Sequence, residues 1–323
     1  MSPGRDAGPG LVLHVPGHML GPDEAALPGL FQKLAAGFRS RGVRVETRWR
    51  DRVALAEMGE TADLHLIHNG AVRHPRVLNT GLAYVFPFWY CDAHGIFADS
   101  SLASAAFDPG AEDPEAAASF FAAHARRIVG QRLSRYGQPN RRAEFAGGAI
   151  AVFLQGDSEP VERMRHMREA EMFEAVVAAR GHREVLVKAH PRNRSGDTGA
   201  ILERARELQG VTVTDANVHD ILAASAVTVS ISSATALEGM FHRVPAVLCG
   251  RSDLHHCAET ARDPGAVAGA LRTALGRRYP FEAFVHWFLG AGMLNTGHDD
   301  LLDRVVARFR AQGVDMAALG LHG

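Results

Sequence analysis

The stretch VLVKAHPRN, Val185–Asn193, begins as a buried β-strand and ends in cations. Its first three residues are apolar and two of them are β-branched, as is typical of strands inside a sheet. A lysine, a histidine, a proline and an arginine then follow, and Arg194 adds another cation. We therefore expect a strand that carries polar side chains from a protein interior to the edge of a sheet.

Apolar runs with strand character alternate with helical patterns on both sides of this stretch. Before it, the pattern predicts strands or helices over residues 11–17, 28–42, 43–49, 62–70, 82–90 and 114–136. The alternation restarts over residues 149–157, 161–180, 184–191, 199–210, 211–215, 218–225, 226–232, 233–243 and 245–250. Such alternation indicates βαβ units and parallel sheets.

The polar stretch GQPNRRAEFAGG, Gly137–Gly148, interrupts this alternation and marks a domain boundary. We therefore predict an α/β protein of two Rossmann-like domains with a cleft between them, residues 1–143 and 144–323. Whether the last helices pack back on the N-terminal domain is left open.

Composition excludes several classes of protein. The chain has 323 residues, enough for two domains, and its 35 Lys+Arg against 36 Asp+Glu argue against a protein that coats nucleic acid. Three scattered cysteines suit a reducing cytoplasm, and no apolar run reaches the roughly 18 residues of a membrane helix. No G-x-G-x-x-G follows a strand, so a dinucleotide-dependent dehydrogenase is unsupported.

Ligands of an open parallel sheet bind outside the carboxyl ends of its strands. In VTVSISSATALEGM, Ser232 and Ser233 stand where a strand turns into a helix, and either can serve as N-cap beside an anion. Capping alone is the plainer interpretation of these serines. Glu238, in the same helix, can accept two hydrogen bonds from a ribose, or form an i,i+4 ion pair with His242.

The second polar strand end is KAHPRNR. Lys188, His190 and Arg192, with Pro191 fixing the turn, can donate to a phosphate or a sugar carboxylate, as can Arg194. A surface loop with solvated charges is the alternative. Two such motifs, predicted at one sheet edge, together favour a phosphate site.

The order of strand, HP, SS-x-x-x-x-E helix and P-A-V-x-x-G strand resembles the nucleotide half of GT-B glycosyltransferases that use CMP-activated acidic sugars. The wider pattern is similar to bacterial capsule-synthesis proteins of the β-Kdo transferase type, and it covers Ile150 to Gly250. The resemblance implies that His190, Ser232 and Ser233 bind the CMP phosphate and that Glu238 binds the ribose. Lys188, Arg192 and Arg194 then face the remaining negative charge.

The resemblance also implies a catalytic carboxylate in the N-terminal half, as base or as nucleophile of a retaining transfer. The stretch FPFWYCDAHGIFADSS, Phe86–Ser101, carries Asp92 in a D-x-x-G pattern similar to the reactive loop of the β-Kdo transferases. His94 is its possible partner and Asp99 the fallback. An Asx-turn before Gly95 is the plainer interpretation of Asp92. His14 and His18, near the end of the first strand, are expected to face the same cleft.

These implications together predict a transferase that moves Kdo from CMP-β-Kdo onto a saccharide or lipid-linked acceptor in capsule or surface polysaccharide synthesis. Another donor, such as CMP-sialic acid, CDP-glycerol or a UDP- or GDP-sugar, is the alternative, as is a non-catalytic capsule assembly or export protein. We expect no metal and no other cofactor. We also expect a cytoplasmic location; peripheral contact with the inner membrane or with polysaccharide assembly proteins is left open.

Overall fold

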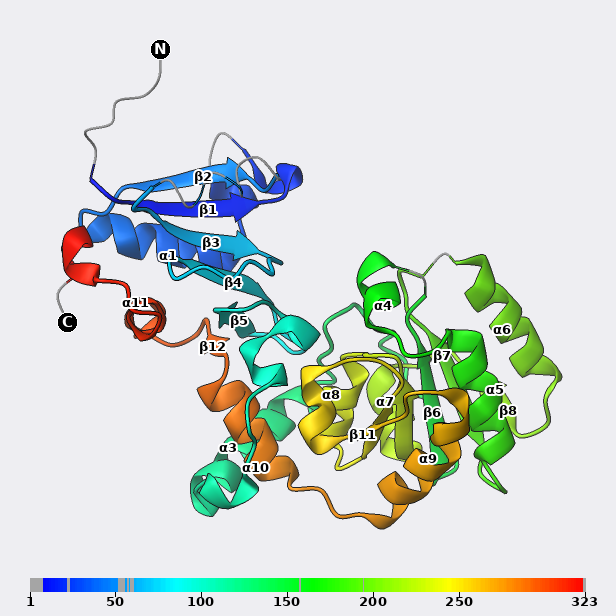
Figure 1. Ribbon diagram of the computed structural model, residues 1–323. Coiled ribbons are helices and arrows are strands. Elements are labelled where there is room, and N and C mark those ends of the chain that lie inside the picture. Colours follow the sequence, from blue (N-terminus) through cyan, green and yellow to red (C-terminus); the bar gives the residue numbers. More distant parts are fainter. Residues whose placement is uncertain are drawn as a thin grey trace. The chain divides into compact units, whose positions relative to one another are not determined.

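The computed structural model describes residues 8–21, 24–51, 56, 58, 61–156, 158–193 and 195–321. They form two compact units (Figure 1): unit 1 comprises the described parts of Met1–Ala105 and Gly292–Gly323, and unit 2 comprises those of Ala106–Ala291. The expected boundary at residue 143 differs from this division. Residues 106–143 lie in unit 2 because helix α3 (Pro114–Ile128) packs against helices α8 (Thr235–Phe241) and α10 (Phe281–Val285) of that unit.

Unit 1 is built on one mixed sheet. Its strands, in the order in which they pair, are β12 (Leu294–Asn295), β5 (Phe88–Asp92), β4 (Val77–Leu82), β3 (Leu64–His68), β1 (Leu11–Val15) and β2 (Val45–Trp49). Strands β1 to β4 are parallel, whereas β5 runs antiparallel to both of its neighbours. Helices α1 (Gly29–Ser40) and α11 (Leu301–Ala311) bury their apolar side chains in the core on one face of this sheet.

The segment predicted as one strand over residues 82–90 is instead a hairpin. Strand β4 ends at Leu82, and β5 starts at Phe88 after a turn that contains the cis Phe86–Pro87 bond. The apolar pattern concealed this turn because Ala83, Tyr84 and Val85 are buried as deeply as the strands beside them. As a result β5 reverses direction, and Asp92 lies opposite Asn79 of β4 rather than at the carboxyl ends of the parallel strands.

Unit 2 is a doubly wound parallel domain. Its strands pair in the order β11 (Glu259–Thr260), β10 (Ala246–Leu248), β9 (Ser225–Ser230), β6 (Ala149–Leu154), β7 (Val185–Ala189) and β8 (Val211–Val213). All five pairings are parallel. The first strand along the chain, β6, pairs with the second, β7, on one side and with the fourth, β9, on the other. The strand order therefore reverses between β6 and β9, which is where such sheets bind ligands.

Helices cover both faces of this sheet. Helices α5 (Glu169–Ala179), α6 (Gly196–Glu207) and α9 (Val267–Gly276) pack on one face, and α7 (Val218–Ala224) and α8 on the other. The single helix predicted over 161–180 is two, α4 (Glu159–Met164) and α5. The break occurs because Arg165 is extended and forms a β-bridge with Gly250, while the His166 N–H donates to the Cys249 carbonyl.

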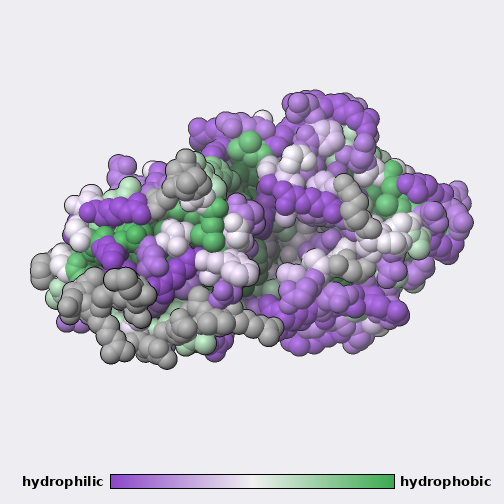
Figure 2. Space-filling view, turned by 90° about the horizontal axis from the view of Figure 1, so that it is seen from above, coloured by the Kyte–Doolittle hydropathy of each residue, from purple (hydrophilic) through white to green (hydrophobic). Residues whose placement is uncertain are grey.

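The two units together form a two-domain Rossmann-like α/β protein, as the sequence predicted. Hydrophilic residues dominate the face that Figure 2 draws, and hydrophobic residues lie between them in separate groups. Among the described helices, none combines the length and hydrophobicity that crossing a membrane requires.

Candidate functional site

The carboxyl ends of β6 and β9 are joined by one side chain. Gln155, the first residue after β6, accepts the backbone N–H of Ser232 on its Oε1 atom at 2.7 Å. Only the amide oxygen can accept this proton, so the orientation of the Gln155 amide is fixed and its Nε2 lies 3.5 Å from Ser232 Oγ as a donor. The strand order reverses between these two ends, so Ser232 stands at the ligand position of the sheet.

Both serines accept hydrogen bonds from within the domain. Ser232 Oγ accepts from Gln155 Nε2, and Ser233 Oγ accepts the backbone N–H of Thr235 at 3.2 Å. A hydroxyl that accepts internally still has its O–H to donate outward. The prediction that Ser232 or Ser233 is the N-cap of the helix was wrong by one residue, since α8 starts at Thr235 and Ala234 occupies the cap position.

His190, like the two serines, accepts a hydrogen bond from within its own domain. Its ring Nδ1 accepts the backbone N–H of Arg192 at 3.1 Å, and the backbone N–H of His190 donates to the Leu154 carbonyl at 2.7 Å. Burial, and then the charges of Arg192 and Arg135, lower the pKa of His190, so the ring is neutral at pH 7. A neutral imidazole that accepts at Nδ1 carries its proton on Nε2, which is therefore a donor.

We call Gln155, His190, Ser232 and Ser233 the strand-end cluster. Its three outward donors follow β7 and β9, the two strands that flank β6, and so lie within about two strand spacings, ~10 Å, of one another. Each of the three has its acceptor atom occupied from inside the domain. The cluster therefore offers donors to a ligand, and an anion such as a phosphate is the ligand that accepts them.

Residues 190–192, which we call the HPR turn, pack against the loop that follows α3. The ring of Tyr136 lies 4.4 Å from that of His190, edge to face, and the Arg192 guanidinium stands 5.0 Å from the Tyr136 centroid. Pro191 and Arg192 are exposed, and Arg194 lies outside the described residues. Tyr136 thus holds Arg192 beside His190, where its charge adds to the field of the cluster.

Lys188 does not point to this cluster. Its Nζ donates to the carbonyls of Asp215 and Ala216, at 2.9 and 2.8 Å, and its side chain is buried. Burial lowers the pKa of Lys188. Two of the three ammonium protons are thus donated to the loop between β8 and α7, and Lys188 also contributes to the lining of the cavity described below. That Lys188 faces the ligand's charge stays a prediction.

Glu238 is also engaged from within. Its side chain is 1% exposed, and it accepts hydrogen bonds from the Ser134 hydroxyl and the Arg135 backbone, while Oε1 has no partner. Burial raises its pKa to about 7. The alternative ion pair with His242 is absent, because His242 Nε2 bonds His219 Nδ1 at 2.9 Å. In this structure Ser134 takes the place that the sequence assigned to a ribose hydroxyl.

A cavity of about 920 Å³ opens at the ends of β7 and β8. Pro191, Leu202, Arg206 and Thr214 contribute to its lining, together with the loop at residues 137–139. It lies on the β7 side of the cluster, whereas Ser232 lies on the β9 side. Pro191, the neighbour of His190 in the chain, is the lining residue next to the cluster.

The Asp92 carboxylate, in unit 1, accepts hydrogen bonds from the loop that follows it. It accepts three backbone N–H groups, those of His94 at 2.7 Å, Gly95 at 3.1 Å and Ser101 at 2.9 Å, and also the Ser101 hydroxyl. Only 7% of the residue is exposed. This is the Asx-turn interpretation extended to Ser101, and it leaves little of the carboxylate to a substrate.

The other predicted residues of this loop are more accessible. His94 and Asp99 are both half-buried, and Asp99 packs over Gly95, whose missing Cβ would lie 2.9 Å from the Asp99 Cβ. His18 is exposed in a short 3-10 helix, Gly17–Met19. The expectation for His14 was wrong: it is fully buried and its Nε2 lies 3.0 Å from His65 Nδ1.

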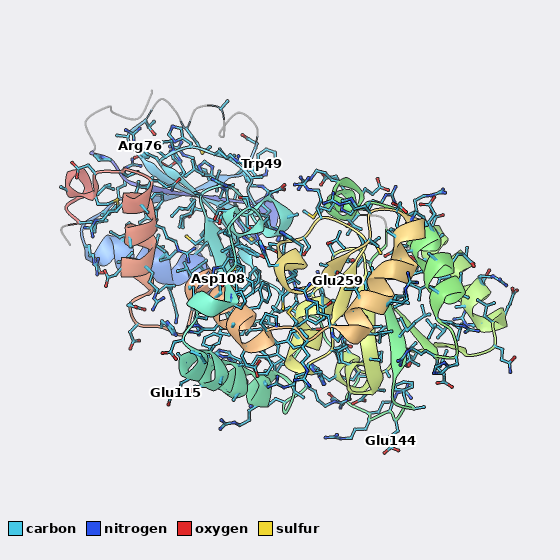
Figure 3. All side chains as sticks on the ribbon, turned by 60° about the horizontal axis from the view of Figure 1, so that its bottom comes forward. Trp49, Arg76, Asp108, Glu115, Glu144 and Glu259 are labelled. Atoms are coloured by element: carbon cyan, nitrogen blue, oxygen red, sulfur yellow. The ribbon has the colours of Figure 1, made fainter. Side chains whose placement is uncertain are left out.

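An exposed tryptophan ends strand β2 of unit 1. Trp49, which is labelled in Figure 3, is 58% exposed. The next residue, Arg50, donates to the carbonyls of His68 and Asn69 at the end of β3. The carboxyl ends of β2 and β3 are thereby tied together, with Trp49 left facing solvent.

Sequence reasoning missed Gln155, Tyr136 and Glu169. Gln155 follows an apolar run directly, so the rule of reading each strand's end could have found it. Tyr136 and Glu169 have no signal of this kind, because their contacts with His190 and with the loop after β6 join segments distant in sequence.

No protein-family model matches the chain, and no curated protein matches its sequence. Solved structures do match, among them KpsC of Thermosulfurimonas dismutans. Its β-Kdo 2,7 transferase has a TM-score of 0.50 at 13% identity, over 85% of this chain and 88% of that one. Its β-Kdo 2,4 transferase has a TM-score of 0.50 at 17% identity, over 84% and 88%. At such identities the likeness shows the fold alone, and that fold is the two-domain Rossmann-like one.

Proposed function

We propose that this chain is a glycosyltransferase of the GT-B type that transfers Kdo from CMP-β-Kdo to a saccharide or lipid-linked acceptor of capsule or surface polysaccharide. The strand-end cluster of unit 2 would bind the phosphate of the donor. Unit 1 would supply the carboxylate that transfer needs. The β-Kdo transferases among the similar folds motivate the choice of sugar, and the cluster motivates the choice of an anionic ligand.

The observation that carries the proposal is the shared polarity of Ser232, Ser233 and His190. Each accepts a hydrogen bond from its own domain and keeps its proton for a ligand. Such donors stabilise the negative charge that grows on a leaving phosphate during glycosyl transfer. They supply a stabilisation that a metal ion would otherwise give, so we assign no metal to the reaction.

Arg192 supports an acidic sugar over a neutral one. Its guanidinium is held beside His190 by the Tyr136 ring, so a permanent cation stands next to the phosphate donors. A guanidinium pairs in a bidentate manner with a carboxylate, and Kdo carries one. A CMP-activated acidic sugar would thus meet the cluster with its phosphate and Arg192 with its carboxylate.

For the reactive carboxylate we favour Asp99 over Asp92. Asp92 already accepts three N–H groups and one hydroxyl, which fixes the loop in shape. Asp99 is half-buried in the same loop and reaches its surface. His94, whose backbone is bonded to Asp92, would be positioned by that bond to assist.

A non-catalytic binding protein of the same fold is the second candidate. It is favoured by one observation, that the carboxylate first expected to react is used to organise its loop. Such a protein would bind a CMP compound through the cluster and release no CMP from it.

The test is to incubate the protein with CMP-Kdo, CMP-sialic acid, CDP-glycerol, UDP-sugars and GDP-sugars, each with a glycolipid acceptor, and to measure nucleotide release and thermal shift. The proposal predicts CMP release from CMP-Kdo. Binding without release would indicate the binding protein, and release only from a UDP- or GDP-sugar would overturn the donor assignment.

A further inference from the structure

The backbone amides of the loop after strand β6 donate hydrogen bonds to a carboxylate of the protein itself, that of Glu169. The backbone N–H of Gly156 donates to Glu169 Oε2 at 3.1 Å, and the backbone N–H of Gln155 donates to the other carboxylate oxygen, Oε1. Glu169 is 7% exposed. Two consecutive backbone amides therefore converge on one buried carboxylate, an arrangement that binds anionic groups in many phosphate sites.

These amides lie beside the strand-end cluster. Gln155 donates its backbone N–H to Glu169 and, with its side chain, holds Ser232 across the reversal point of the sheet. In doubly wound domains, the amides that follow the first strand and the groups that follow the fourth are the two places where phosphates rest. A ligand with two linked phosphates would need both; a ligand with one phosphate needs only the serines and His190.

Helix α5 and the packing of the loop after β6 fix the Glu169 carboxylate next to the two amides. Glu169 is the first residue of α5, so the helix fixes its backbone. Gly156 has a positive φ of 77°, and a Cβ on it would lie 2.4 Å from the side chain of Asn193, so this loop packs tightly against the HPR turn. The amides at 155 and 156 are thus held in one conformation, with the carboxylate as their acceptor.

A phosphate cannot share these two donors with Glu169. Each N–H donates to one acceptor, and a second anion beside a buried carboxylate is repelled by its charge. A ligand's second phosphate would have to displace the carboxylate and leave it buried without its donors. A single phosphate on Ser232, Ser233 and His190 leaves the Glu169 carboxylate with both of these donors.

We propose that Glu169 makes the site selective for nucleoside monophosphates and their sugars over nucleoside diphosphates, by filling with its own carboxylate the amides that a second phosphate would occupy. This inference rests on the proposed function, because it takes the strand-end cluster to be the phosphate site. It deepens that function by naming the residue that would set the donor class: CMP-sugars rather than CDP-glycerol or UDP-sugars.

The test compares CMP with CDP, which share base and ribose and differ by one phosphate. Dissociation constants for both are measured by calorimetry on the wild-type protein and on Glu169→Gln and Glu169→Ala. Glu174→Gln is the matched control, because Glu174 lies on the same helix, is exposed, and pairs only with Arg204 among the contacts given for it. It removes the same charge without vacating the amides.

We expect wild type and Glu174→Gln to bind CMP more tightly than CDP. The Glu169 variants should lower the ratio of the CDP to the CMP dissociation constant by about tenfold or more, the value of one charge-assisted hydrogen bond. A wild-type protein that binds CDP as tightly as CMP overturns the inference, as does an unchanged ratio in the Glu169 variants. The wild-type comparison decides even if Glu169→Ala does not fold. Binding of neither nucleotide to any of the proteins overturns the proposed function itself, and the inference with it.

Discussion

The side-chain amide of Gln155 contacts Ser232 at two atoms. Its Oε1 accepts the Ser232 backbone N–H at 2.7 Å, and its Nε2 lies 3.5 Å from the Ser232 hydroxyl. This pair joins the first and fourth strands of unit 2 at the point where the sheet reverses its order. It also sets the Ser232 hydroxyl as a donor, which is the property that an anion site requires.

Replacing Gln155 by methionine should therefore weaken nucleotide binding more than it weakens the fold. Methionine keeps the length of the side chain and removes both contacts, so the Ser232 hydroxyl is no longer oriented. We expect the dissociation constant for CMP to rise about tenfold, the value of one to two hydrogen bonds, with a small change in thermal midpoint. Calorimetry with CMP measures it. Gln209→Met, an exposed glutamine of the same unit, is the control, and equal effects of the two substitutions would contradict the role given to Gln155.

Substitution of Asp92 should lower the stability of the protein, whereas substitution of Asp99 should abolish its activity. In Asp92→Asn, one oxygen becomes an NH₂ group that faces backbone N–H donors, so we expect a loss of about 2 kcal/mol of stability and unchanged CMP affinity. Asp99→Asn should abolish CMP release from CMP-Kdo, while thermal midpoint and CMP affinity stay near wild type. A stable Asp92→Asn protein that binds CMP and has lost turnover would return the catalytic role to Asp92.

Several features of the fold and site could be predicted from sequence because they depend on local pattern. The apolar runs before His190 and Ser232 predicted two strand ends at one edge of a sheet, and the structure places the two strands on either side of β6. The domain class followed from the alternation of strands and helices. Both patterns can be recognised in the sequence without knowledge of any tertiary contact.

The contacts of Lys188 and Glu238 could not be predicted, because each depends on a partner distant in sequence. Lys188 was expected to face a ligand, but the carbonyls of Asp215 and Ala216 lie within its reach. Glu238 was expected to bind a ribose, but Ser134 from another loop donates a hydrogen bond to it. No spacing in the sequence encodes these contacts, because they arise only when the loops pack.

Glu238 should give the stability a distinct pH dependence. Burial raises its pKa from 4.5 to about 7, so the folded state keeps a proton that the unfolded state releases. Its contribution therefore falls as pH rises from about 4.5 to about 7, by up to about 3 kcal/mol, and is constant above that. Glu238→Gln removes this dependence.

The measurement is the difference in unfolding free energy between wild type and Glu238→Gln at pH 5 and pH 8. We expect the variant to gain relative to wild type at pH 8. The comparison is needed because His14, His65 and His242, whose pKa values burial lowers to about 4, act in the opposite direction in both proteins. An equal difference at the two pH values would mean that Glu238 ionises in the folded state as it does in solvent.

Chelation of metal ions should leave the reaction unchanged. In the proposed reaction the donors of Ser232, Ser233 and His190 stabilise the negative charge that develops on the leaving phosphate, so no metal cation is needed for this stabilisation. We expect the rate of CMP release to be the same with EDTA as without it, and the same after dialysis and addition of Mg²⁺ or Mn²⁺. A rate that falls with EDTA and returns with one of these ions would require a metal in the site.

The most direct test of the central claim is calorimetric titration of CMP into the wild-type protein and into Ser232→Ala/Ser233→Ala. Loss of two hydroxyls should raise the dissociation constant about a hundredfold, at one charge-assisted hydrogen bond each. The thermal midpoint should fall only by the loss of the Ser233 contact with the Thr235 N–H, about 1 kcal/mol. CMP binding that is unaffected by the double substitution would contradict the assignment of the strand-end cluster as the phosphate site.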